Sequence, residues 1–302
     1  MTMFQPRRVG RDNQLRARML FTMLLLGLVY GLFLWFLISV AGVGVMLGVA
    51  VVLVLVQFFL SDKLVLTSMR AKVVTPEQAP ELHATIDRLS MTAGIPKPKV
   101  AIADMSVPNA FATGRSQKHA AVAVTTGLLH VLNERELEGV LAHEISHIAS
   151  RDVQVMTYAS FLSVVASTLM SFFFWMGLFG GFGRSRSSGG SYIMIAYIVT
   201  ILVWVISQVL IAALSRYREY AADRGAAMLT NRPRDLANAL QRISGSLTGL
   251  PQNDLRRAET LNAFFIMPAI GDGFASLFST HPPMARRIER LLELERTTML
   301  TG

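Results

Sequence analysis

The sequence contains no cysteine among its 302 residues. Disulfide bonds are therefore excluded, and any zinc site must use nitrogen and oxygen ligands. Charged residues are also scarce: they make up 16% of the chain, whereas soluble domains average about 25%. Apolar residues make up 52% of the chain. This combination indicates a protein that contacts a lipid bilayer.

Acidic residues are the scarcer kind of charge, with 20 Asp and Glu against 29 Lys and Arg and a net charge of +9. A basic balance is found in nucleic-acid-binding proteins. It is also found in membrane proteins whose cytoplasmic loops are rich in Lys and Arg. The long apolar runs described next favour the second interpretation. We therefore expect the lipid bilayer as a partner and no nucleic acid.

Three stretches of the chain lack any charged side chain. Residues 19–61 are long enough for two membrane-spanning helices of about 20 residues each, and Gly42 and Gly44 lie where a hairpin turn would sit. Residues 158–182 and 192–214 are each long enough for one further span. A cleaved signal peptide is the alternative for the first stretch, because it contains a weak Ser-Val-Ala cleavage pattern, but its apolar core is too long for one.

Local patterns predict the helices and strands of the charged parts. Leu82, Ile86 and Leu89 repeat at helical intervals within residues 80–92. Asn133, with a glutamate three residues later, has the form of a helix-capping pair. The remaining predictions are short strands at 99–103 and 120–124, a helix opening at 127, a loop at 244–253 and a closing amphipathic helix at 284–296.

Residues 143–147 read His-Glu-Ile-Ser-His and fit the H-E-x-x-H pattern. His143 and His147 stand four residues apart on one helical face, so both imidazoles can reach one metal ion. Glu144 lies on nearly the same face, where it can take a proton from metal-bound water and pass it to a leaving amine. The pattern also arises by chance, but apolar residues precede it at helical spacing and favour a partly buried helix.

A catalytic zinc takes three protein ligands and leaves one position to water. Glu219 is the best candidate for the third ligand. Asp223 lies four residues later on the same helical face and can accept a hydrogen bond from a ligand histidine. The alanines around them would let this helix approach the metal helix closely. The alternative is an exposed helix whose acids pair only with Arg216, Arg218 and Arg224.

Taken in order, these motifs resemble the HtpX family of bacterial membrane metalloproteases, relatives of the CAAX prenyl endoproteases. The resemblance covers the N-terminal double span, Pro-Asn-Ala-Phe-Ala-Thr-Gly at 108–114, the motif at 143–147, two further hydrophobic segments, Glu219 to Asp223, and Ser-Thr-His-Pro-Pro at 279–283. It implies one Zn²⁺ per subunit held by His143, His147 and Glu219, with Glu144 as the general base.

Three further sites gain meaning from the resemblance. Asn109-Ala110-Phe111 is similar to the edge strand of thermolysin-like proteases, which binds the substrate backbone; the alternative is an ordinary Asx turn after Pro108. His281 matches a histidine that donates to the developing oxyanion, although a histidine before two prolines is otherwise an unremarkable loop residue. Arg287 either braces that site or is solvated beside Glu289.

The fold implied by the resemblance is α+β and mainly helical, with a gluzincin-like zinc protease domain fused to about four transmembrane helices. We expect five segments along the chain. They are a basic N-terminal segment at 1–18, a transmembrane hairpin at 19–61, the first part of the catalytic domain at 62–152, two further hydrophobic transmembrane segments within 153–214, and the second part of the catalytic domain at 215–302.

The expected function is that of a multi-pass zinc metalloendopeptidase of the plasma (inner) membrane. It would hydrolyse membrane or misfolded proteins at the cytoplasmic face, in membrane-protein quality control. Because His143 and Glu219 must meet, the chain between them crosses the bilayer an even number of times or not at all. The arginines before residue 19 then place the catalytic domain and both termini in the cytoplasm. Nothing in the sequence indicates the oligomeric state.

Two other classes of function remain as alternatives. A catalytically inactive membrane adaptor or scaffold could retain the metal site, but it predicts damage to a ligand or to the base, and the sequence shows none. A transporter or channel needs charged or polar residues inside its spans. The spans here offer only Gln57, Gln208 and scattered hydroxyl groups.

Overall fold

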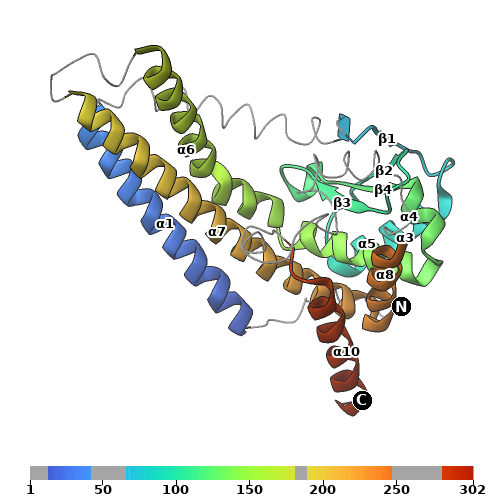
Figure 1. The fold of residues 1–302 in the computed structure, drawn as a ribbon. Helices are drawn as coiled ribbons and strands as arrows, with labels where there is room; N and C mark the ends of the chain where they lie inside the picture. The colour runs from blue at the N-terminus through green and yellow to red at the C-terminus, as the bar shows by residue number, and fades with distance from the viewer. Residues whose placement is uncertain (1–12, 42–65, 68, 181–188, 247–280, 302) are drawn as a thin grey trace.

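The computed structural model describes residues 13–41, 66–67, 69–180, 189–246 and 281–301. A bundle of long helices lies beside a smaller unit that contains a sheet, and one of the long helices runs from the bundle into that unit (Figure 1). The predicted second arm of the N-terminal hairpin, with its turn near Gly42, lies outside the described residues.

The bundle is formed by helices α1 (Asn13–Ala41), α6 (Asp152–Gly180) and α7 (Gly189–Thr230). Their shared core consists of apolar side chains from all three helices: Leu26, Tyr30, Phe33, Ala159, Val165, Ala166, Leu169, Ala196, Ile211 and Leu214. The hydroxyl of Tyr30 donates to the carbonyl of Ala159 (2.6 Å) and ties α1 to α6. The opposite faces expose large apolar side chains, such as Leu24 and Trp35 on α1.

Two stretches of the described helices are long and apolar enough to cross a bilayer, namely Asn13–Phe36 and Met194–Thr230. The second belongs to α7, which continues without interruption past the boundary predicted between residues 214 and 215. The composition becomes polar there, but arginine, glutamate and alanine are all good helix formers, so the helix does not end where the apolar run does. That boundary therefore falls inside a helix.

The sheet has four strands in the order β1-β2-β4-β3. They are β1 (Ala71–Val73), β2 (Lys99–Ala103), β3 (Ala110–Thr113) and β4 (Ala121–Thr125), and a 3₁₀ turn at Gln117–His119 joins the last two. β2 and β4 pair in parallel, while β1 and β3 pair antiparallel with their neighbours. The two strands predicted from sequence are confirmed as β2 and β4. The strand β3 lies at one edge of the sheet.

The helices of this unit are α3 (Pro80–Ala93), α4 (Thr126–Val131), α5 (Glu134–Ala149), α8 (Pro233–Ser246) and α10 (Met284–Thr301). The predicted cap of α5 is present: the Asn133 side chain accepts from the amide of Glu136 (3.0 Å), and the Glu136 carboxylate accepts from the amide of Asn133 (3.1 Å). One prediction was wrong at its start. Residues 244–246 are the end of α8 rather than loop, because Ile243 is buried and anchors that last turn.

Helix α5 lies at the centre of the unit, between the sheet and the pair α7 and α8 (Figure 1). Val140, Leu141 and Ile145 are fully buried in one core with strand and helix residues from both sides. Gly139 permits the close approach of α8, since a Cβ atom there would lie 3.0 Å from the backbone nitrogen of Leu236. The helix that carries the H-E-x-x-H pattern is thus held rigidly on every side.

Candidate metal centre

His143 and His147 lie one turn apart on α5, and their rings meet edge to face with centroids 4.6 Å apart. Their Nε2 atoms are 3.1 Å from each other. Two imidazole nitrogens gain nothing from such an approach by themselves unless a proton or a cation lies between them. Both rings are therefore aimed at one point.

Glu219 on α7 completes the group. Its carboxylate oxygens lie 3.5 Å from Nε2 of His143 and 3.3 Å from Nε2 of His147, and ligand atoms of the three residues all lie within 4.8 Å of one another. Donors about 2.0–2.1 Å from one tetrahedral ion are separated by about 3.3 Å. The observed separations fit that geometry, and two imidazoles with one carboxylate form a donor set that zinc accepts.

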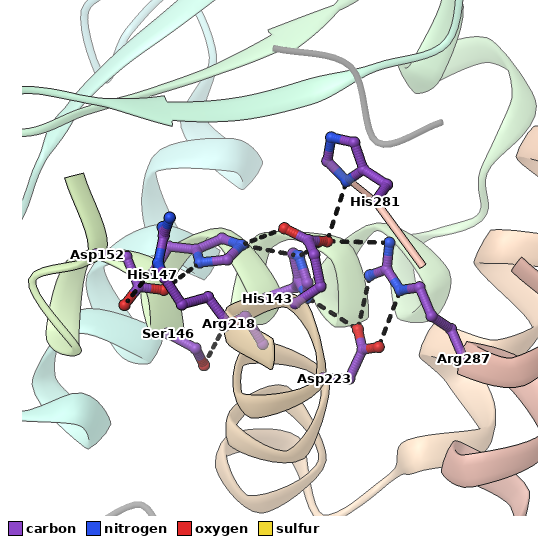
Figure 2. A network of polar contacts seen from close by, with 10 residues as sticks. His143, Ser146, His147, Asp152, Arg218, Asp223, His281 and Arg287 are labelled. Carbon is purple, nitrogen blue, oxygen red and sulfur yellow. Dashed lines mark hydrogen bonds and ion pairs between the residues drawn. The ribbon is translucent and has the colours of Figure 1, made fainter. Parts of the chain in front are cut away.

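Asp223 and Arg287 support the side of His143 away from this point (Figure 2). Nδ1 of His143 lies 3.0 Å from Oδ1 of Asp223. Arg287 donates to both oxygens of Asp223 (2.9 and 2.7 Å), and its Nη1 lies 3.1 Å from Glu219. The side chain of Arg287 is 1% exposed. It is therefore not solvated beside Glu289, and the bracing alternative describes its position.

A second carboxylate supports His147, and the sequence did not reveal it. Nδ1 of His147 lies 2.6 Å from Oδ2 of Asp152, and because a carboxylate only accepts, this nitrogen carries the proton and leaves Nε2 free to ligate. The other Asp152 oxygen lies 3.2 Å from Nε of Arg218 (Figure 2). The sequence feature that could have indicated this partner is an aspartate five residues after the second histidine, at the start of the next helix.

The electrostatics of the site favour a cation. Burial opposes a charge on His147, but the carboxylates of Asp152 and Glu219 outweigh it and raise the pKa of this imidazole to about 10. Burial likewise opposes a charge on His143, and Asp223 and Glu219 raise its pKa as well. Burial raises the pKa of Asp152, but Arg218 and His147 outweigh it and lower it. The carboxylates that favour protons on these imidazoles would also favour a divalent cation, which must displace those protons to bind.

Glu144 and His281 also reach this region. Glu144 follows His143 on α5 and is buried, with 4% of its surface exposed. Nδ1 of His281 lies 3.4 Å from a carboxylate oxygen of Glu219, although the histidine precedes α10 and is distant in sequence (Figure 2). The structure therefore brings the predicted ligands together with His281, Asp223 and Arg287 into one cluster, and Glu144 is buried next to His143 on α5.

The predicted substrate strand lies at the sheet edge. Asn109 immediately precedes β3 and is fully buried; its backbone amide donates to Oγ1 of Thr125 (2.8 Å), and its carbonyl accepts from the Thr125 amide (2.9 Å). Ala110 and Phe111 are the first residues of β3, and the Phe111 side chain is buried in a small core with Met69. Within the described ranges no strand pairs with the outer side of β3.

Comparisons with known proteins agree with this geometry. Residues 76–295 match the family described as Peptidase family M48. "Protease HtpX homolog" from Moorella thermoacetica is 51% identical over 96% of this chain and 97% of its own length. "Protease HtpX homolog 2" from Methanosarcina mazei is 48% identical over 96% and 98% of the two chains, and "Protease HtpX homolog 1" from Streptomyces coelicolor is 46% identical over 94% of each.

A solved structure shares the fold. The crystal structure of S. mikatae Ste24p aligns with a TM-score of 0.56 and 22% sequence identity, covering 92% of this chain and 66% of that one. The mainly helical architecture with a small sheet is thus shared with Ste24p. The family match and the curated relatives together show that the chain belongs to peptidase family M48 and is a zinc metallopeptidase.

Proposed function

We propose that this membrane metalloprotease is a zinc endopeptidase that hydrolyses membrane or misfolded proteins at the cytoplasmic face, in membrane-protein quality control. The observation that carries the proposal is the position of Glu219. It joins the two histidines of α5 at one point, and it lies on the same continuous helix, α7, that includes a stretch long and apolar enough to cross a bilayer. The peptidase site is therefore built directly onto a candidate membrane helix.

We assign His143, His147 and Glu219 as the ligands of one Zn²⁺ per subunit, with the fourth position open. When bound there, zinc makes a water molecule more acidic and polarises the scissile carbonyl. The separations of 3.1 to 3.5 Å between the donor atoms support this assignment. Asp223 and Arg287 hold His143 and Glu219 in place through the contacts described above.

Glu144 is the proposed general base. It would take the proton of the attacking water and return it to the leaving amine. A general base must lie within hydrogen-bonding distance of the proton that it removes. His281 is the proposed donor to the developing oxyanion. Its position beside Glu219 supports this role, because a group 3.4 Å from a proposed ligand is close to the reacting carbonyl.

The substrate is proposed to bind as an added strand along β3, at Asn109, Ala110 and Phe111. An edge strand offers unpaired backbone groups to an extended peptide. Both backbone groups of Asn109 are already paired with Thr125, and the Phe111 side chain is buried, so Asn109 would contribute by anchoring the start of this edge rather than by pairing with the peptide. Recognition through the backbone suits an enzyme that accepts many unfolded sequences.

We further propose that the catalytic domain is split into 62–152 and 215–302 and faces the cytoplasm with both termini. The loops near 40–44 and 183–191 would lie outside. The meeting of α5 with α7 supports an even number of crossings between them. A tag inserted at Ser188 should be reached by a membrane-impermeant label in intact cells, and a tag at Gly302 should not. Labelling of Gly302, or protection of Ser188, would contradict this topology.

The activity is tested with the full chain in detergent. Casein hydrolysis should stop with a zinc chelator and return when Zn²⁺ is restored. Hydrolysis that persists in the metal-free protein would contradict the metal assignment. Glu144→Gln expressed in cells then serves as a substrate trap, and membrane or unfolded proteins should be enriched over a Glu144→Gln/Glu219→Ala control. A trapped set made up of folded soluble proteins would overturn the quality-control role.

A further inference from the structure

The two histidines of the metal centre have outer partners of the same chemical kind but on different elements. His143 contacts Asp223, which is held by Arg287 of α10. His147 contacts Asp152, which is held by Arg218 of α7. Each chain runs from an imidazole through a carboxylate to an arginine (Figure 2). The first ends on α10, and the second ends on α7, the helix that runs from the bundle into the metal-site unit.

The second chain is buried and joins two long helices. Asp152 is 3% exposed and is the first residue of α6, and Arg218 is 8% exposed and immediately precedes Glu219 on α7. A buried ion pair is costly unless its geometry is maintained, because each charge has lost its water. Its 3.2 Å separation therefore depends on how α6 lies against α7.

We propose that Asp152 and Arg218 are positioning residues for His147, and that through them the orientation of this ligand depends on the packing of α6 against α7. The inference rests on the proposed role of His147 as a metal ligand. Asp152 fixes the ring by accepting from Nδ1, and Arg218 fixes Asp152. The packing of the bundle thereby influences the orientation of His147, although α6 contributes no ligand.

The local backbone explains how Asp152 reaches the histidine. Arg151 has a positive φ of 57° and lies with Ser150 between the end of α5 and the start of α6, so the chain bends there and leaves the helical path of α5. Asp152 then faces back toward the last turn of α5. Farther along the bundle, Ser163 of α6 lies 3.4 Å from Gln208 of α7, amid the apolar core that holds the two helices together. A change in that packing moves Asp152 relative to Arg218.

Removing the acceptor should change metal binding before it changes folding. Without Asp152 the proton of His147 can move to Nε2, and a protonated Nε2 cannot ligate. Loss of such an outer partner typically lowers metal affinity by about 10–100-fold. Asn in its place can still accept from Nδ1 through its amide oxygen, so it should restore part of the affinity.

The first experiment compares Asp152→Ala, Asp152→Asn and Glu138→Gln in the full chain. Glu138 is a matched control, because it is a buried carboxylate on α5 held by Arg88 and Arg232 and lies away from the metal centre. Zinc affinity is measured by chelator competition, and the absorption bands of the Co²⁺-substituted protein report ligand geometry. We expect a loss of about 10–100-fold for Asp152→Ala, a smaller loss for Asp152→Asn, and altered bands in both.

Unchanged zinc affinity and Co²⁺ bands in Asp152→Ala would overturn the proposal, as would an equal loss in Glu138→Gln. His147→Ala distinguishes the positioning role of Asp152 from the ligand role of His147. If it loses the Co²⁺ bands while Asp152→Ala does not, only the positioning role fails. If His147→Ala keeps them, the proposed ligand set fails as well.

The second experiment tests dependence on the bundle. Ser163→Leu enlarges a side chain at the α6–α7 contact and should lower zinc affinity in the otherwise natural protein. In Arg218→Gln, where Asp152 is no longer tied to α7, the same substitution should have little further effect. Such non-additivity is the expected sign of coupling. Fully additive effects on zinc affinity, or no effect of Ser163→Leu, would contradict the dependence on helix packing.

Discussion

The metal-site unit encloses charged side chains, whereas the helix bundle exposes large apolar ones. Around the metal centre His143, Glu144 and Arg287 are almost fully enclosed. On α1, the apolar residues Phe21 and Trp35 are 67% and 69% exposed. In water such an apolar face would be a cost, whereas in lipid it is ordinary. The two regions are thus folded for different solvents.

The comparison also shows where function can be sensitive. In the metal-site unit buried charges such as those of Asp152, Asp223 and Arg287 are paired with one another or with a histidine, so the loss of one group leaves another uncompensated. On the outer face of the bundle an apolar side chain faces lipid or detergent, so a substitution there replaces one apolar contact by another. The difference predicts large effects of small changes in the first region and small effects of comparable changes in the second.

The largest effect is expected from Glu144→Gln. The variant should keep its zinc and lose activity by several orders of magnitude, because the proton acceptor is removed while the ligands remain. Zinc content by atomic absorption and casein hydrolysis measure the two properties. Activity within about tenfold of the natural protein would remove Glu144 from the mechanism.

His281→Ala should come next, with a loss of roughly 10²–10³ in kcat. KM should change little and zinc should stay bound, since an oxyanion donor acts mainly in the transition state. Steady-state kinetics on a fluorogenic peptide separate kcat from KM. A natural kcat would return His281 to the role of an ordinary loop residue.

Asp223→Ala should lower zinc affinity by about 10–100-fold, because His143 loses the acceptor for its Nδ1. Glu219→Ala is the matched variant one turn earlier on α7, and it should lose more zinc because it removes a ligand. Chelator competition ranks the two. Normal zinc binding in Glu219→Ala together with loss in Asp223→Ala would reverse the assignment.

The smallest effect is expected from Leu24→Ala on the outer face of α1, where the side chain is 65% exposed. We expect the free energy of unfolding in detergent to change by less than about 0.5 kcal/mol. Leu141→Ala, on the buried face of the metal helix α5, should lower it by about 2–5 kcal/mol because it leaves a cavity. Equal changes in thermal unfolding would abolish the contrast between the two regions.

The features that sequence predicted well are those set by local periodicity. Leu82, Ile86 and Leu89 are buried on one face of α3, and the capping pair at Asn133 and Glu136 starts α5 as expected. The i, i+4 spacing of the two histidines likewise follows from helical geometry. Each of these depends on residues within one or two turns.

The features that sequence did not reveal depend on a break between two helices or on solvent. Asp152 is five residues from His147, but the positive φ at Arg151 breaks the helical spacing on which side-chain pairing is normally predicted. Arg218 was considered only as a surface partner for nearby acids. Hydropathy places a segment boundary at residue 214 because the composition changes there, but it does not reveal that one continuous helix, α7, crosses that boundary.

Because α7 is one continuous helix, it relates the position of the metal centre to the position of the apolar run along the same axis. At about 1.5 Å per residue, its 42 residues form a rod of about 63 Å, roughly twice the thickness of the hydrocarbon core. Glu219 follows the apolar run, which ends at Leu214, by only about 8 Å along that rod. A bilayer that fixes the apolar end therefore fixes the distance from the lipid surface at which peptide bonds are cut. Under the proposed topology, the site would meet the chain segments that can approach the membrane surface closely.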